Sequence, residues 1–299
     1  MNRWRKWWNN PVLEKEFQWR MRTKKTPWII FFYLGITFGI LFAVLALMQR
    51  DSSVLFEPST SKWLFLGLGG IQLVMAAFVV PGVTAGLISG ERERQTLPIL
   101  LTTNLSSTQI VLSKWIASIS FIVLLYILSL PIYLVVFMYG GISPEYVWKF
   151  VALYLVTILF YGSLGIFYST LIKRSGVATV LSYVTVAIQG VGLLVVLYLV
   201  ILYHSSAMAG SGSQQPLPWM VGVIAGIHPL LATAHVLYGK VDLFDLGNLN
   251  WDFFSIYLGT YVTLTVILLI GSIYYLAPVR FRWWFGKRKR RPEMEGEAG

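Results

Sequence analysis

Six long stretches of this chain contain no Asp, Glu, Lys, Arg or His, and they limit what it can fold into. Each stretch has 22 to 27 residues, whereas a helix needs about 20 residues to cross a hydrocarbon core roughly 30 Å thick. The stretches are continuously apolar, which favours helices, because a helix satisfies its own backbone in lipid. We therefore predict an all-α polytopic membrane protein. Its six transmembrane helices are expected at Pro27–Met48, Trp63–Ile88, Trp115–Tyr139, Phe150–Ile172, Val177–Tyr203 and Phe253–Ala277.

The composition of the whole chain agrees with this fold class. Only 12% of its residues are charged, about half the share of an average soluble domain, and the mean hydropathy is +0.67. The net charge is +11, from 24 Lys and Arg against 13 Asp and Glu. Together these values exclude a soluble enzyme, a disordered basic protein and a free nucleic-acid binder.

A seventh apolar stretch, Pro216–Tyr238, is a poor straight helix because it contains Pro216, Pro218 and Pro229. Charge decides how to interpret it. With six spans and a cytoplasmic N-terminus, 20 of the 24 Lys and Arg residues lie on the inner side, as the positive-inside bias requires. A seventh crossing would place the basic C-terminal tail outside. We therefore expect residues 216–238 to form a re-entrant or interfacial element on the outer side.

Both ends of the chain are expected in the cytoplasm. Residues 1–26 are basic and rich in Trp, with apolar residues at helical spacing, and they predict an interfacial helix that leads into the first span. The alternative is a basic tail that only sets topology. Residues 278–299 are expected to be a flexible cytoplasmic tail, and residues 27–277 to form one six-helix transmembrane domain.

The spans offer few groups for chemistry. Gln72 and Gln189 are the polar residues at mid-membrane that would line a pathway, although they would equally well bond across helices. The glycine pairs Gly35–Gly39 and Gly162–Gly165 are expected to allow close helix packing. We expect no catalytic, cofactor or metal site: there is no cysteine, no H-E-x-x-H motif and no P-loop sequence.

The segment from Ser89 to Lys114 is longer than a turn between two spans requires. The charges of the E-R-E-R sequence lie where the chain leaves the bilayer, and the apolar residues Leu97, Ile99, Leu100 and Leu101 follow. An apolar patch in a cytoplasmic loop is expected to be covered, either by the membrane face or by a partner protein.

This segment resembles the pattern S-G-E-[RK]-E-x-G-T-L-x-x-L-L-x-T-P-[LV]-S-x-x-x-I-[VL]-x-x-K of the ABC-2 type permeases. These are membrane subunits of bacterial ATP-binding-cassette transporters. The matching residues are Ser89, Gly90, Glu91, Arg92, Glu93, Thr96, Leu97, Leu100, Leu101, Thr103, Leu105, Ser106, Ile110, Val111 and Lys114. The chain departs at Gln95, where the pattern has Gly, and at Asn104, where it has Pro. Its N-terminal N-P-V-L-E-K-E is similar to the family's opening.

The resemblance implies that two permease subunits, of the same or related chains, form a dimer above separate ATPase subunits that bind ATP and Mg²⁺. The loop would then be a coupling helix that docks on the ATPase. The residues expected to couple are Glu91, Arg92, Glu93, Arg94, Thr96, Leu97, Leu100 and Leu101. The three leucines would be buried anchors, and Glu91, Glu93 and Arg94 would form ion pairs at that interface.

The resemblance also favours export from the bacterial cytoplasmic membrane, and the uncharged spans suggest a hydrophobic or amphipathic cargo. Two alternatives stay open. A stand-alone secondary carrier would work without an ATPase, and a non-transporting subunit of an envelope complex would use the same fold for mechanical or signalling work.

Overall fold

A computed structural model describes residues 26–48, 58–98, 106–138, 142–209, 219–238 and 252–277. The predicted interfacial helix of residues 1–26 lies outside this part of the chain, except for Thr26, which begins α3; the predicted tail of residues 278–299 lies outside it as well. The helices are α3 (Thr26–Met48), α4 (Pro58–Thr84), α5 (Ser89–Glu93), α7 (Ser107–Met138), α8 (Pro144–Leu171), α9 (Ser175–Ala187), α10 (Leu193–Ala209), α11 (Trp219–Ile227), α12 (Pro229–Tyr238) and α13 (Phe253–Leu276), with a π-helix, η1 (Ile188–Gly192), between α9 and α10.

Six helical segments of this part of the chain are long and apolar enough to cross a membrane, and they lie at the six predicted places; the bent pair of α11 and α12 would be a seventh if it crosses as one span. They contain the six uncharged stretches almost entirely, but several extend further. Helix α7 begins eight residues before Trp115. Helix α8 begins at Pro144, where Ser143 caps its N-terminus by accepting a hydrogen bond from the Glu145 N–H. The helices are longer than the uncharged stretches because charged residues are tolerated where a helix leaves the bilayer.

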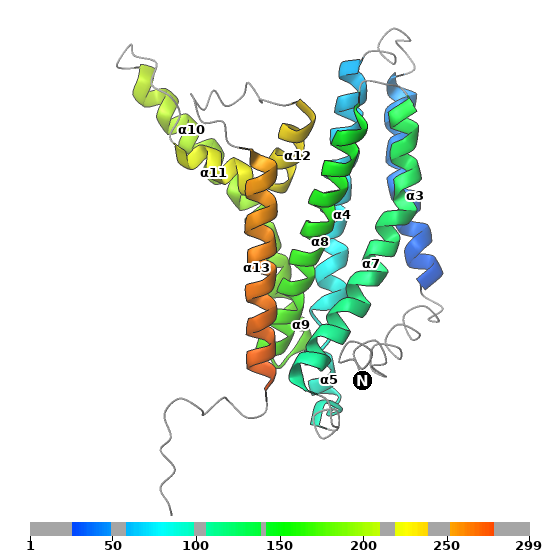
Figure 1. Ribbon diagram of the computed structural model, residues 1–299, viewed down its shortest axis with the longest axis vertical. Coiled ribbons are helices and arrows are strands. Elements are labelled where there is room, and N and C mark those ends of the chain that lie inside the picture. The colour runs from blue at the N-terminus through cyan, green and yellow to red at the C-terminus, as the bar shows by residue number, and fades with distance from the viewer. Residues whose placement is uncertain are drawn as a thin grey trace, which may run out of the picture.

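Helix α8 lies at the centre of the bundle, with α4, α7, α9 and α13 packed around it (Figure 1). Glycines permit the closest approaches. A Cβ atom at Gly162 would overlap Ile119 of α7, and one at Gly165 would overlap Thr84 of α4, so this pair packs as predicted. Helix α3 packs at the edge of the bundle, mainly against α4 and α7.

The second glycine pair, on α3, behaves differently. No described atom lies within 4 Å of a Cβ built at Gly35 or Gly39. Gly35 instead lines an apolar hollow of about 320 Å³ between α3 and α7. The described residues supply no close helix contact for this pair, and its packing role stays a prediction.

The seventh apolar stretch forms two short helices. Helices α11 and α12 meet at an angle of 96° around His228, so the pair is either a broken span or a re-entrant loop. Pro229 explains the break, because a proline ring cannot continue a preceding helix without a clash. The prediction that this stretch is no straight helix is confirmed.

Candidate functional site

The second span ends in a tight elbow, which comprises residues 85–96. After α4 the chain makes a turn over residues 85–88, and α5 then closes in a Schellman motif. The Thr96 N–H donates to the Glu91 carbonyl at 3.0 Å, and the Gln95 N–H donates to the Arg92 carbonyl at 3.2 Å. Gln95 has φ of +57°, the left-handed conformation that glycine adopts most easily. The glycine of the ABC-2 pattern therefore stands where the backbone favours it.

The start of the elbow is fixed to α8 by one buried hydroxyl. The Ser169 Oγ accepts hydrogen bonds from the Ile88 N–H at 2.8 Å and the Ser89 N–H at 3.0 Å, and it lies 3.2 Å from the Ser89 Oγ. Ser89 and Ser169 are both fully buried. These bonds satisfy backbone groups at the N-terminus of α5 that have no partner within the helix.

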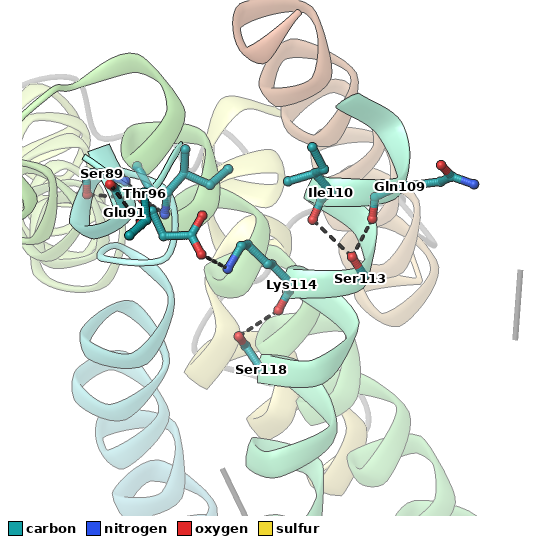
Figure 2. Close-up of polar contacts among 10 residues, drawn as sticks. Ser89, Glu91, Thr96, Gln109, Ile110, Ser113, Lys114 and Ser118 are labelled. Atoms are coloured by element: carbon teal, nitrogen blue, oxygen red, sulfur yellow. Dashed lines mark hydrogen bonds and ion pairs between the residues drawn. The ribbon is translucent and has the colours of Figure 1, made fainter. Parts of the chain in front are cut away.

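An ion pair joins the elbow to the third span. The Lys114 Nζ lies 2.7 Å from the Glu91 Oε1, and the Lys114 side chain is only 3% exposed (Figure 2). Charged side chains are almost never buried this completely unless they are paired. The Glu91 Oε2 is also buried, and it accepts no hydrogen bond from the part of the chain that the structure describes. Glu91 is thus held at the junction of α5 and α7.

The next two charges of the E-R-E-R sequence are directed at other helices. Arg92 donates to the Thr170 carbonyl of α8 at 3.2 Å. The Glu93 carboxylate accepts hydrogen bonds from the Ser175 Oγ at 2.6 Å and the Ser175 N–H at 2.9 Å, at the first residue of α9. Glu93 lies beyond the apolar part of the second span, and the hydrogen bond from the Ser175 hydroxyl, with that from its N–H, lowers the pKa of this carboxyl below its ordinary value.

Of the remaining coupling candidates, one is buried and two are exposed. Leu97 is buried in a cluster with Ile88, Ile110, Val111, Ile166 and Leu276. Arg94 and Thr96 are exposed, and the Thr96 hydroxyl donates to the Glu91 carbonyl at 3.2 Å. Leu100 and Leu101 lie outside the described residues.

Gln72 lies away from this elbow, fully buried at the centre of the bundle. Its Nε2 donates to the Ser129 Oγ at 2.5 Å and to the Tyr33 hydroxyl at 3.3 Å, and its Oε1 accepts from the Tyr133 hydroxyl. The Tyr154 hydroxyl donates to the Gln72 carbonyl at 2.9 Å. These contacts link α3, α4, α7 and α8. Gln72 thus makes the hydrogen bonds across helices that its second interpretation describes.

Gln189 belongs to a separate group of contacts. It lies in η1, and its Nε2 donates to the Tyr261 hydroxyl of α13. The Gln189 Oε1 is buried and has no hydrogen-bond partner among the described residues. The two glutamines therefore belong to separate groups of hydrogen bonds.

The described residues contain no group of three or more His, Cys, Asp or Glu that would hold a metal ion. His228 lies at the sharp bend between α11 and α12, and His235 follows seven residues later, within α12. His228 is bound to backbone atoms, and His235 packs against the Phe253 ring.

The bundle of six long apolar helices, with a polar elbow tied to three of them, defines a multi-pass helical membrane protein. The family model "ABC-2 family transporter protein" matches residues 10–235, more than half of the chain. The chain therefore belongs to the ABC-2 family of transporter membrane proteins, whose membrane domain lacks the ATPase site and works with a separate ATPase. A search of curated proteins found no match.

Proposed function

We propose that this permease exports a hydrophobic or amphipathic substrate, driven by ATP hydrolysis on the separate ATPase subunit. Two permease subunits, identical or related, would form the transmembrane unit in the bacterial cytoplasmic membrane. Both termini and the segment of residues 89–114 would face the cytoplasm, where the positive-inside bias places the basic segments. ATP and Mg²⁺ would be bound by the ATPase and not by this chain.

The observation that carries the proposal is the set of bonds around the elbow. Residues 88–93 continue from α4, are hydrogen-bonded to α8 and the start of α9, and are ion-paired to α7. A displacement of this elbow would therefore act on four of the six spans at once. Rigid-body motion of packed elements is a common way to change access to a site.

The coupling residues would then have two kinds of role. Glu91, Arg92, Glu93 and Leu97 contact helices of their own chain, and they support a role in transmitting motion into the spans. Arg94 and Thr96 are exposed and would meet the ATPase directly. Leu100 and Leu101 follow in sequence and would supply the apolar anchors of that interface.

The composition of the spans supports the proposed cargo. None of the six uncharged stretches carries an ionisable acid, base or imidazole, whereas ion-coupled carriers place such groups at mid-membrane. A path through these helices would suit an apolar or amphipathic molecule better than an ion.

The direct test is affinity purification of the chain from its host in mild detergent, followed by mass spectrometry. We expect a P-loop ATPase in a one-to-one ratio, and we expect the Leu100→Asp variant to lose it because a charge replaces an apolar anchor. The matched control is Leu55→Asp, which in sequence lies between the end of α3 and the start of α4, both at the other end of the bundle from α5 (Figure 1); this variant should retain the ATPase.

Recovery of a stable, solitary chain from the unmodified protein would contradict the proposal and favour a stand-alone carrier. Retention of the ATPase by the Leu100→Asp variant would contradict the assigned docking position. Equal loss in the Leu55→Asp control would show that the substitution acts through folding and not through docking.

A further inference from the structure

Three parts of the chain meet beside the break between α11 and α12. The Gln189 Nε2 of η1 donates to the Tyr261 hydroxyl of α13, and that hydroxyl donates to the Ile227 carbonyl at the end of α11 at 2.9 Å. One residue further along each segment, the His228 Nε2 lies 2.8 Å from the Gly190 carbonyl. The π-helix, the break and α13 are thus joined by a closed set of hydrogen bonds.

Both ring nitrogens of His228 are used. The Nδ1 accepts a hydrogen bond from the Leu231 N–H at 3.4 Å, which satisfies one of the free donors at the start of α12. The Nε2 must then carry the proton and donate it to the Gly190 carbonyl, a tautomer that we assign from these bonds. The side chain is buried, with the residue 3% exposed. One neutral imidazole therefore holds two helices at once.

The Gly190 carbonyl, which His228 contacts, belongs to the π-helix. The Leu193 N–H donates to the Ile188 carbonyl, five residues back, so the regular ladder of bonds four residues apart is interrupted here. Helices bend where such a bulge occurs or where a side chain inserts into the ladder. Beyond η1, α10 leans away from α13 together with α11 (Figure 1).

The opposite side of η1 has little support. Ile188 and Val191 are 63% and 66% exposed, and no described atom lies within 4 Å of a Cβ built at Gly190. The bonds of Gln189 and His228 therefore hold this bend from one side.

We propose that His228 is a positioning residue that sets the bend of the fifth span. It acts through its hydrogen bond to the Gly190 carbonyl, which fixes the orientation of α10 relative to the α11–α12 pair. This inference goes beyond the proposed function, and its geometry does not depend on the cargo or on the ATPase.

Two substitutions separate the two bonds of the imidazole. His228→Gln places an amide N–H where the imidazole Nε2 lies and so keeps the bond to Gly190, but it removes the acceptor for the Leu231 N–H at the start of α12. His228→Asn offers an oxygen near the Nδ1, and Asn is a good N-cap residue, but its short side chain cannot reach Gly190. His228→Ala removes both bonds, and Gly190→Ala keeps the carbonyl and adds a methyl group into open space.

The readout is the distance between spin labels, measured by double electron–electron resonance in nanodiscs. The chain has no cysteine, so labelled pairs can be introduced without background. One pair, Val195→Cys with Val266→Cys, reports on α10 against α13. The other, Val180→Cys with Val266→Cys, reports on α9 against α13; all three positions are at least 50% exposed. The labelled chain is diluted with unlabelled chain so that only distances within one subunit are seen.

We expect the α10–α13 distance to shift or broaden in the Asn and Ala variants and to keep its value in the Gln and Gly190→Ala variants. The α9–α13 distance should stay unchanged in all of them. The inference is overturned if Asn keeps the α10–α13 distance while Gln shifts it, because His228 would then only cap α12. It is also overturned if Asn and Gln both leave the distance unchanged. If the Ala variant does not fold, the comparison of Asn with Gln decides alone.

Discussion

At the scale of single residues, Gln95 is the most informative position in the elbow. It adopts a left-handed conformation at φ +57°, which costs a non-glycine residue about 1–2 kcal/mol. Glycine removes this cost but loses up to about 1 kcal/mol in backbone entropy on folding. We therefore expect Gln95→Gly to raise the free energy of unfolding by up to about 1 kcal/mol. Gln95→Val should lower it, because a β-branched residue fits this conformation worst. Thermal unfolding of both variants in one detergent tests this, and shifts of the same sign would contradict it.

A second residue-scale prediction concerns the Glu91–Lys114 pair. Removing one partner of a fully buried pair costs about 3–5 kcal/mol, and the Glu91 side chain is 27% exposed. We therefore expect Lys114→Met to lower stability by up to about 3 kcal/mol. Adding Glu91→Gln should recover much of this loss, since no unpaired charge is left. A double-mutant cycle of unfolding free energies measures the coupling, and additive effects of the two changes would contradict the ion pair.

At the scale of helices, Gln72 is the test of how the bundle is held together. Hydrogen bonds between transmembrane helices contribute about 0.6 kcal/mol each, and up to about 1.7 kcal/mol. Gln72→Leu removes the side-chain bonds to Tyr33, Ser129 and Tyr133, so we expect stability to fall by about 2 kcal/mol. Substrate transport by the folded fraction should persist. Loss of transport at unchanged stability would instead mean that Gln72 lines the pathway.

Some features of the helices can be predicted from the sequence and others cannot. The six spans and the break at Pro229 are predictable, because they follow from the length of a bilayer crossing and from proline geometry. The π-helix at Ile188–Gly192 carries no readable signal. The inward direction of Leu97 is also hidden, because the residues that follow it, Pro98 to Leu101, are all apolar and periodicity cannot tell which of them the bundle buries.

The elbow was predictable only in part. The E-R-E-R sequence marks where the chain leaves the bilayer, but Lys114 counts in the sequence as one more basic residue on the inner side. Its burial against Glu91 depends on the tertiary arrangement that brings Glu91 of α5 beside α7. Because the two residues are 23 positions apart, no local sequence pattern predicts their contact.

At the scale of the whole molecule, the proposed orientation leads to a prediction about access from the two sides of the membrane. Single cysteines introduced by Arg94→Cys and Leu55→Cys would lie on opposite sides. In intact cells we expect a membrane-impermeant maleimide to label Leu55→Cys, and to label Arg94→Cys only after the membrane is opened. The reverse pattern would mean that the basic ends face outward, against the positive-inside bias.

The central claim is that the segment after the second span couples this permease to an ATPase. The most direct measurement places a photo-crosslinking amino acid at Leu101 and, as a control, at Leu55, and irradiates intact host cells. We predict a crosslinked product from Leu101 that contains a P-loop ATPase, and none from Leu55. A crosslink from Leu101 to lipid alone, in cells where the ATPase is present and the permease is functional, would contradict the claim.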